Sequence, residues 1–275
     1  MHFSKYEGLG NDFVVFACER PEALSTAEAI ALCDRRRGVG ADGVLQILPP
    51  VSPGALARMR VINADGSVPE MCGNGLRCVA LALTATGAPS RFIVDTDAGP
   101  RACSVDGSVD GSVDGRGDGT GGSAEGQISV DMGVVKFLGD VVVALEDGPH
   151  TFHLGDAGNP HAITFEPKTR IAMEHLGRAL NAHAAFPNGT NVEFATLTNR
   201  GIDLVVFERG VGFTEACGTG ACATVAAACA LGKLPYDAPV NVRLPGGDLT
   251  VTVARSGATR MRGPARLAFR GEWLA

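Results

Sequence analysis

The sequence has no excess of basic residues and no basic run. Its 24 Lys and Arg residues stand against 30 Asp and Glu residues, which gives a formal net charge of -6. Proteins that bind nucleic-acid backbones or anionic membrane surfaces usually carry a basic patch. The composition therefore argues against both kinds of partner and favours a small-molecule substrate.

The sequence also has no long apolar run and no targeting pattern. No stretch approaches the roughly 20 apolar residues that span a bilayer. The first residues, from Met1 to Gly8, do not show the basic and then apolar pattern of a signal peptide. We therefore expect a cytoplasmic protein that has no contact with a membrane.

Metal-binding and disulfide patterns are missing as well. The eight cysteines show neither paired Cys-x-x-Cys spacing nor a His/Cys set of the kind that binds zinc, so we expect no metal. A reducing compartment argues against a disulfide framework, and most cysteines are expected to be free thiols. Six of them are expected to act as small apolar residues: Cys18, Cys33, Cys78, Cys103, Cys222 and Cys229.

Hydrophobic residues make up 45% of the 275 residues, which is enough for a large core and fits two domains. A capping-box pattern at Ser25 and Glu28 predicts a helix that continues to about Arg36, and a second helix is expected near Met173–His183. Runs rich in Val, Ile and Phe predict strands at Arg58–Ile62, Arg91–Val94, Asn191–Ala195, Ile202–Glu208, Val240–Leu244 and Asp248–Val253.

The segment 104–126 contains Ser-Val-Asp-Gly three times in succession, followed by a tail rich in Gly, Asp and Ser. It has almost no apolar side chain whose burial would offset the entropy lost on ordering. Its four-residue period does not match the nonapeptide repeats that bind calcium. We interpret it as a flexible surface insertion or hairpin extension near the boundary between the two domains.

One pattern occurs once in each half of the chain. Cys-Gly-x-Gly opens a stretch rich in Ala, Leu and Val at Cys72 and again at Cys217, and a glycine, Gly87 or Gly232, closes each stretch fifteen residues later. Strong helix formers that end at a glycine predict a helix. Each helix is apolar on nearly every side, so each should be buried at the centre of its own domain.

A cysteine at the start of a helix has a specific chemistry. The first N–H groups of a helix have no partner within it, and the helix dipole adds partial positive charge there. A thiolate is stabilised in such a place, so Cys72 or Cys217 could act as a base near neutral pH. The same N–H groups can bind a carboxylate.

Two such helices facing each other would place one sulfur on either side of a substrate Cα. One thiolate would remove the proton while the opposite thiol donates one, which inverts the centre. Without a cofactor, hydrogen bonds from the helix N-termini would stabilise the carbanion. The duplicated pattern therefore predicts a cofactor-independent amino-acid epimerase.

The order of motifs along nearly the whole chain closely resembles the diaminopimelate epimerase family. The motifs are Gly8-Leu-Gly-Asn-Asp-Phe13, Gly40-Ala-Asp-Gly43, Asn63-Ala-Asp-Gly-Ser67, Met71-Cys-Gly-Asn-Gly75, Gly158-Asn-Pro-His161, Thr190-Asn-Val-Glu-Phe194, Glu208-Arg-Gly210 and Ala216-Cys-Gly-Thr-Gly-Ala-Cys222.

The resemblance implies an α+β fold of two pseudo-symmetric domains, each a barrel-like, mostly antiparallel sheet around a central buried helix. We expect an N-terminal half at 1–127, a C-terminal half at 128–263 and a tail strand at 264–275 that returns to the N-terminal half. The implied reaction interconverts LL- and meso-diaminopimelate, in lysine and peptidoglycan-precursor biosynthesis. No cofactor is expected, and a homodimer is left open.

The resemblance also assigns roles to single residues. Cys72 and Cys217 would be the catalytic pair, and His161 and Glu208 would bias the protonation of the thiols. Arg209 would pair with the distal carboxylate of the substrate. The other residues expected to bind substrate are Asn11, Asn63, Gly73, Asn74, Asn159, Asn191, Glu208, Gly218 and Thr219.

The chain departs from the family pattern at Tyr6-Glu7, where Met-His is common, at Phe213, where Glu is usual, and in the insertion. Three alternatives stay open at this point. The same thiols could epimerise another amino acid of the proline or hydroxyproline type, the fold could be a non-catalytic binding module, or the cysteines could form a redox pair.

Overall fold

The computed structural model describes residues 1–106 and 125–274, so most of the Ser-Val-Asp-Gly segment lies outside the described residues. The chain forms two compact units. Unit 1 comprises Met1–Val130 and Arg262–Ala275, and unit 2 comprises Asp131–Met261. The chain passes from one unit to the other inside two strands, β7 (Glu125–Val134) and β16 (Ala258–Glu272).

The sheet of unit 1 closes on itself. Its strands follow the order β1-β2-β3-β4-β5-β6-β7-β16, and β16 also pairs with β1, which leaves no free edge between the first and last strand. The strands, besides β7 and β16, are β1 (His2–Gly8), β2 (Asn11–Ala17), β3 (Gly43–Leu48), β4 (Ala57–Asn63), β5 (Arg91–Thr96) and β6 (Gly99–Asp106).

The sheet of unit 2 has the order β16-β15-β14-β12-β11-β10-β9-β8, and the short strand β13 pairs with β12. The additional strands are β8 (Lys136–Leu145), β9 (Gly148–Asp156), β10 (Pro160–Thr164), β11 (Asn191–Thr198), β12 (Gly201–Glu208), β13 (Gly212–Thr214), β14 (Val240–Leu244) and β15 (Gly247–Val253). All six strands predicted from the sequence are present.

Each unit contains two helical crossovers, which explain the only parallel pairs among the registers resolved in the described residues. Antiparallel strands can be joined by tight turns, whereas a parallel pair needs a longer connection. In unit 1, α1 (Thr26–Cys33) joins β2 to β3 and α2 (Gly73–Ala85) joins β4 to β5. In unit 2, α3 (Arg170–Ala182) joins β10 to β11, and α4 (Gly218–Ala230) lies between β12 and β14.

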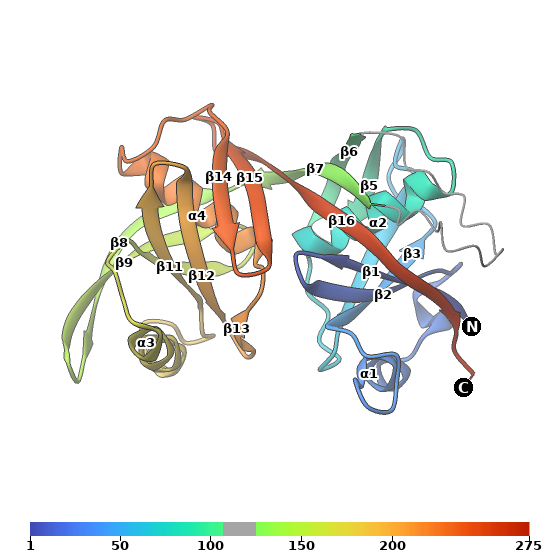
Figure 1. Ribbon diagram of the computed structural model, residues 1–275, viewed down its shortest axis with the longest axis horizontal. Helices are drawn as coiled ribbons and strands as arrows, with labels where there is room; N and C mark the ends of the chain where they lie inside the picture. The colour runs from blue at the N-terminus through green and yellow to red at the C-terminus, as the bar shows by residue number, and fades with distance from the viewer. Residues whose placement is uncertain (107–124, 275) are drawn as a thin grey trace. The chain divides into compact units, whose positions relative to one another are not determined.

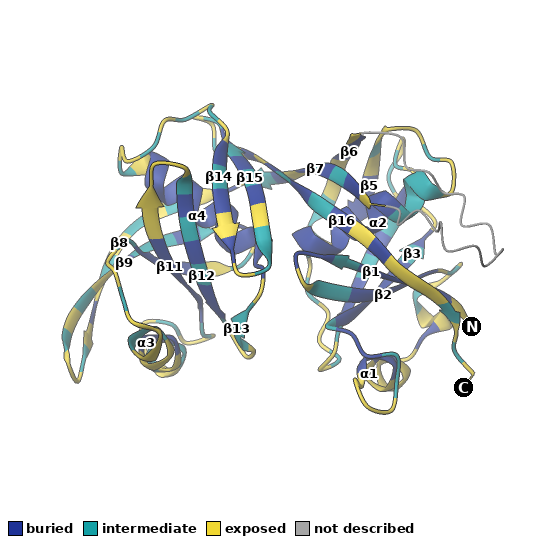
Figure 2. Ribbon diagram, in the orientation of Figure 1, coloured by how far each residue is buried: buried dark blue, intermediate teal, exposed yellow. Residues whose placement is uncertain are grey.

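The second crossover helix of each unit is the one predicted from the repeat. Both have 13 residues, and the first nine residues of α2 and the first twelve of α4 are buried. Figure 1 shows each helix against the strands of its own unit, and Figure 2 colours most of each helix dark blue, as buried. Gly87 and Gly232 follow the helix ends with positive φ, as a C-terminal glycine should. The predicted α+β fold with two pseudo-symmetric domains is confirmed.

The helix predicted from Ser25 to Arg36 ends earlier than expected. Its capping box is present, but α1 stops at Cys33. The carboxylate of Asp34 accepts hydrogen bonds from the backbone N–H groups of Arg36 and Arg37 at 2.7 and 2.9 Å. This local turn replaces the helical hydrogen bonds, because an Asp side chain that binds nearby backbone N–H groups competes with helix formation. A short 3-10 helix, Pro21–Ala23, precedes α1.

Candidate active site

The predicted site residues of unit 1 gather at one end of its closed sheet, where β2 and β3 begin and β4 ends. Asn11 begins β2, and Asn63 ends β4 opposite Gly43 at the start of β3. Because β2 and β3 run parallel while β4 runs antiparallel to β3, these positions meet at the same end of the sheet. Cys72 lies in the segment after β4 and directly precedes α2.

Unit 2 repeats this arrangement with different residues. His161 near the start of β10 is in register with Asn191 at the start of β11, and Glu208 ends the antiparallel strand β12. After the short hairpin through β13, Cys217 directly precedes α4. In each unit, therefore, polar residues at one end of the sheet accompany a cysteine at the start of the central helix.

Both cysteines are N-cap residues. The Sγ atom of Cys72 accepts a hydrogen bond from Gly75 N at 3.3 Å, and that of Cys217 accepts one from Gly220 N at 3.4 Å. A Cβ on Gly75 would lie 2.9 Å from Leu45, and a Cβ on Gly220 would lie 2.7 Å from Glu193 Oε1. The second glycine of each Cys-Gly-x-Gly motif thus lets the first helical turn lie close to its neighbours.

The thiol of Cys217 is buried and holds its proton. Burial raises the pKa of Cys217 well above its ordinary value, and the nearby carboxylates of Glu208 and Glu193 raise it further. Hydrogen bonds from Thr219 and Gly220 lower the pKa but do not offset these effects. The lowered pKa expected for a cysteine at a helix start is therefore wrong for Cys217, because desolvation outweighs the helix N-terminus.

Glu208 lies beside this thiol. Burial raises the pKa of Glu208, while hydrogen bonds from Thr214 and Cys217 favour its charged form. The hydroxyl of Thr214 donates to Glu208 Oε1 at 2.7 Å. Unit 2 thus places a protonated thiol next to a carboxyl group whose protonation state its surroundings can change.

His161 does not contact solvent and is held through both ring nitrogens. Its Nδ1 lies 2.6 Å from Glu193 Oε1, and its Nε2 lies 2.9 Å from Asn159 Oδ1. The side chains of His161 and Glu193 are both fully buried. No role for Glu193 follows from the motifs, although an acidic residue between Val192 and Phe194 in an apolar strand is a signal that could have singled it out.

Asn191 and Arg209, both predicted to bind substrate, are connected. Asn191 Oδ1 accepts from the backbone N–H of Arg209 at 3.0 Å, and Asn191 Nδ2 donates to Pro160 O at 3.1 Å. The guanidinium of Arg209 donates to Asn188 O at 3.0 Å. Both ends of the Asn191 amide are thereby fixed by backbone groups.

In unit 1, the substrate-binding candidates Asn11 and Asn74 are joined directly, because Asn74 Nδ2 donates to Asn11 Oδ1 at 3.1 Å. Asn63 is occupied elsewhere: its Nδ2 donates to Ser67 Oγ at 2.9 Å. Beside Asn11, Asp12 pairs with Lys5 and Arg35. Burial would raise the pKa of Asp12, but the hydrogen bonds from these two cations lower it to about 2.

Two departures from the family pattern have clear structural places. Tyr6 is buried in the core, while Glu7 accepts from Gly10 N at 3.1 Å and from Arg266 Nε at 3.0 Å. Phe213 packs edge-on against Phe207 with ring centroids 5.2 Å apart. All three residues therefore support local structure. Within residues 1–106 and 125–274, no three His, Cys, Asp or Glu side chains are grouped to hold a metal ion.

In the described part of the chain, no helix is both long and apolar enough to cross a membrane.

Solved structures identify the class of fold. A predicted epimerase from Pseudomonas aeruginosa superposes with a TM-score of 0.72 at 18% identity, covering 100% of this chain and 99% of that one. A probable proline racemase from Agrobacterium radiobacter K84 gives 0.68 at 18% identity, covering 100% and 92%. The chain therefore has the same fold as this predicted epimerase and this probable proline racemase.

Sequence comparison identifies the family within that class. The family model described as diaminopimelate epimerase matches residues 3–114 and 154–268. A diaminopimelate epimerase from Rhizorhabdus wittichii is 40% identical over 288 residues, which cover 99% of this chain and 95% of the relative. The chain belongs to the diaminopimelate epimerase family, as its motifs predicted.

Proposed function

We propose that this protein interconverts LL- and meso-diaminopimelate by moving the Cα proton between Cys72 and Cys217. The observation that carries the proposal is the duplication: each unit places a cysteine as the N-cap of a 13-residue buried helix, with a backbone N–H donating to its sulfur. Membership in the diaminopimelate epimerase family supplies the substrate class.

The proposed reaction needs no external oxidant or cofactor. One sulfur, as thiolate, takes the α-proton from one face of the substrate, and the other, as thiol, gives a proton to the opposite face. The result is one inverted centre, a thiol where the thiolate was and a thiolate where the thiol was. N–H groups of Gly73, Asn74, Gly218 and Thr219 would bind the reacting carboxylate and stabilise the carbanion.

Cys217 would enter the cycle as the thiol. Its raised pKa supports a proton-donating state, and His161 and Glu208 would bias its protonation when the direction reverses. Arg209, Asn191 and Asn159 would bind the far end of the substrate. A substrate with polar groups at both ends accounts for this set better than proline does.

The test is α-hydrogen exchange in deuterium oxide, with LL- and meso-diaminopimelate, without pyridoxal phosphate and with a thiol reductant. We expect deuterium at one α-carbon and conversion of each isomer to the other. Proline and hydroxyproline serve as the comparison substrates. Exchange with those and none with diaminopimelate would overturn the proposed substrate.

Single Cys72→Ala and Cys217→Ala variants test the chemistry. Each should lower kcat for isomerisation at least about 10⁴-fold, because a two-base inversion cannot proceed with one thiol. Cys229→Ala, near the far end of the helix that Cys217 caps, is the matched control and should stay active. Isomerisation that survives either of the first two substitutions would refute the two-thiol mechanism.

The need for free thiols also supports our proposal that the protein works in the reducing cytoplasm. Oxidation of Cys72 and Cys217 should abolish activity, and a reductant should restore it. Full activity of the oxidised protein would instead favour a different mechanism.

Our proposal also includes a homodimer. Light scattering of the purified protein, which measures its molar mass, tests this part of the proposal.

A further inference from the structure

We propose that Asp42 is a positioning residue, which sets the orientation of the Asn11 side-chain amide and makes Asn11 an acceptor for a substrate ammonium group. The inference rests on the proposed function and deepens it. Asp42 belongs to the Gly40-Ala-Asp-Gly43 motif, for which the sequence indicates no task. All residues involved lie within unit 1.

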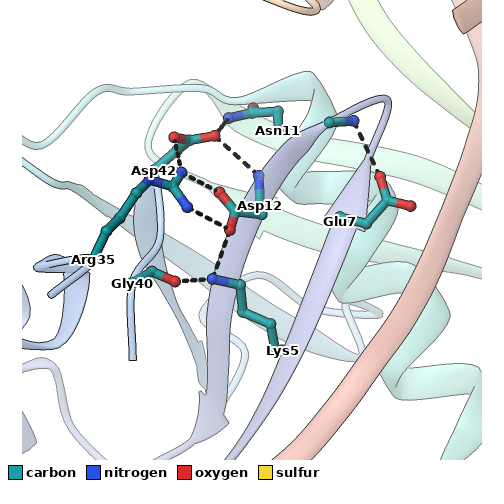
Figure 3. Close-up of polar contacts among 8 residues, drawn as sticks. Lys5, Glu7, Asn11, Asp12, Arg35, Gly40 and Asp42 are labelled. Carbon is teal, nitrogen blue, oxygen red and sulfur yellow. Dashed lines mark hydrogen bonds and ion pairs between the residues drawn. The ribbon is translucent and has the colours of Figure 1, made fainter. Parts of the chain in front are cut away.

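The carboxylate of Asp42 is held by three donors. Its Oδ2 accepts from Asn11 Nδ2 at 2.7 Å and from the backbone N–H of Asp12 at 3.0 Å. Its Oδ1 accepts from the guanidinium of Arg35 at 2.7 Å. Figure 3 shows these contacts together, with Asn11 and Arg35 on different oxygens of Asp42.

These contacts decide which end of the Asn11 amide faces which neighbour. An ionised carboxylate has no hydrogen to donate, so Asn11 must turn its NH₂ group towards Asp42. Its carbonyl oxygen then faces the first turn of α2, where it accepts from Asn74 Nδ2 at 3.1 Å. A carbonyl oxygen has two acceptor sites, and the second suits an ammonium group and not a carboxylate.

Further contacts fix the frame around Asp42. Arg35 bridges both carboxylates, because it also donates to Asp12 at 2.7 Å. Lys5 is buried, lies 2.6 Å from Asp12 and also donates to the carbonyl oxygen of Gly40. Gly40 has a φ of +79°, and a Cβ there would lie 3.0 Å from the Cα of Arg35. The turn before β3 is thus held on both sides of Asp42.

Burial does not account for this network. The side chain of Asp42 is 41% exposed and that of Arg35 is 58% exposed, and exposed ion pairs contribute little to stability. We therefore assign the contacts of Asp42 to the orientation of Asn11 and not to the stability of the fold.

Asp42→Asn tests the assignment. Asn11 and Arg35 contact different oxygens of Asp42, and asparagine replaces one of these oxygens with an NH₂ group. Because Arg35 then competes for the remaining oxygen, the Asn11 amide loses its fixed orientation. We expect KM for diaminopimelate to rise about tenfold while kcat changes less than about threefold. Asp97→Asn is the control, because it removes a comparable surface pair with Arg58 in the same unit and should leave both constants unchanged.

Two double variants separate positioning from a structural role. In Asn11→Asp/Asp42→Asn the amide introduced at position 42 can donate to the acid introduced at position 11. That acid still offers oxygen to Asn74, so KM should return to within about threefold of wild type. In an Asn11→Ala background, Asp42→Asn should raise KM no further. Absence of rescue, or an undiminished effect in the Asn11→Ala background, would overturn the proposal.

Failure of the role proposed for Asp42 can be distinguished from failure of the proposed function. Wild-type protein that exchanges no α-hydrogen of diaminopimelate contradicts the function itself. Active wild type with an unchanged KM in Asp42→Asn contradicts only the role of Asp42. Thermal unfolding checks each variant, and Asp42→Ser provides the same readout if Asp42→Asn does not fold.

Discussion

At the residue scale, the His161–Glu193 pair distinguishes the site residues of unit 2 from those of unit 1. The two side chains are fully buried, and His161 Nδ1 lies 2.6 Å from Glu193 Oε1. Each needs the other as its hydrogen-bond partner, because the burial of a lone charge is costly. Glu193 Oε1 also limits the residue at position 220 to glycine. Glu193 therefore links the histidine to the first turn of the helix that carries Cys217.

Glu193→Gln should slow the reaction. Glutamine keeps the size of the side chain but removes the charge that orients His161, so kcat should fall at least about tenfold, or about 1.4 kcal/mol in the barrier. The pH profile of kcat should also move to lower pH, because the Glu193 charge that raises the pKa of Cys217 is lost. Glu166→Gln, which removes an exposed pair with Lys168 in the same unit, is the control. An unchanged kcat and pH profile in Glu193→Gln would show that the pair is only structural.

The two cysteines and their companions can be predicted from the sequence because both copies of Cys-Gly-x-Gly precede an apolar helix. The partners of those residues cannot. Asp42 and Glu193 contact their targets across pairings between strands, and such contacts depend on strand register. The raised pKa of Cys217 escapes prediction for a related reason: a motif indicates the helix start, but burial by surrounding strands is a tertiary property.

At the element scale, β13 shows how a departure from the family pattern is accommodated. This strand has three residues, and its central side chain, Phe213, packs on Phe207 of β12. The guanidinium of Arg170, at the start of α3, lies 3.3 Å from the centre of the Phe213 ring. An aromatic ring at position 213 thus joins β12, β13 and α3 close to the segment that leads to Cys217.

Phe213→Ala should destabilise unit 2 by about 1 to 3 kcal/mol, through the loss of an aromatic pair and a cation–π contact on a partly exposed ring. Catalysis under native conditions should change little, because the Phe213 ring packs on Phe207 and Arg170, neither of which is a proposed catalytic group. Urea unfolding followed by circular dichroism measures the effect. A variant of unchanged stability whose kcat falls would instead place Phe213 in the active site.

Prediction was most successful for elements with strong local patterns. The two central helices and six strands followed from composition and periodicity, whereas α1 ended early because the Asp34 turn competed with the helix. The pairing order could not be derived locally, since parallel neighbours such as β4 and β5 are separated by a whole helix.

At the scale of the whole molecule, unit 1 is assembled from both ends of the chain. β16 pairs with β1 from His2 opposite Glu272 to Glu7 opposite Arg266, and this pairing closes the sheet. The buried Arg77 of α2 donates to the carbonyl of Pro264 in β16 at 3.1 Å, which connects the central helix to the last strand. Unit 1 therefore cannot complete its fold before the C-terminal strand has been synthesised.

A chain that ends at Met261 tests this dependence. It keeps every residue of unit 2 but loses the closing strand of unit 1, so backbone groups of β1 lose their partners and Arg77 loses its hydrogen bond to Pro264. Hydrogen exchange should show unit 2 protected and unit 1 exchanging as an unfolded chain, since cooperative units open separately. A chain that lacks only Leu274 and Ala275 is the control, because Leu274 is exposed. If the amides of β1 to β6 stayed protected in the longer truncation, the closing strand would not be what completes unit 1.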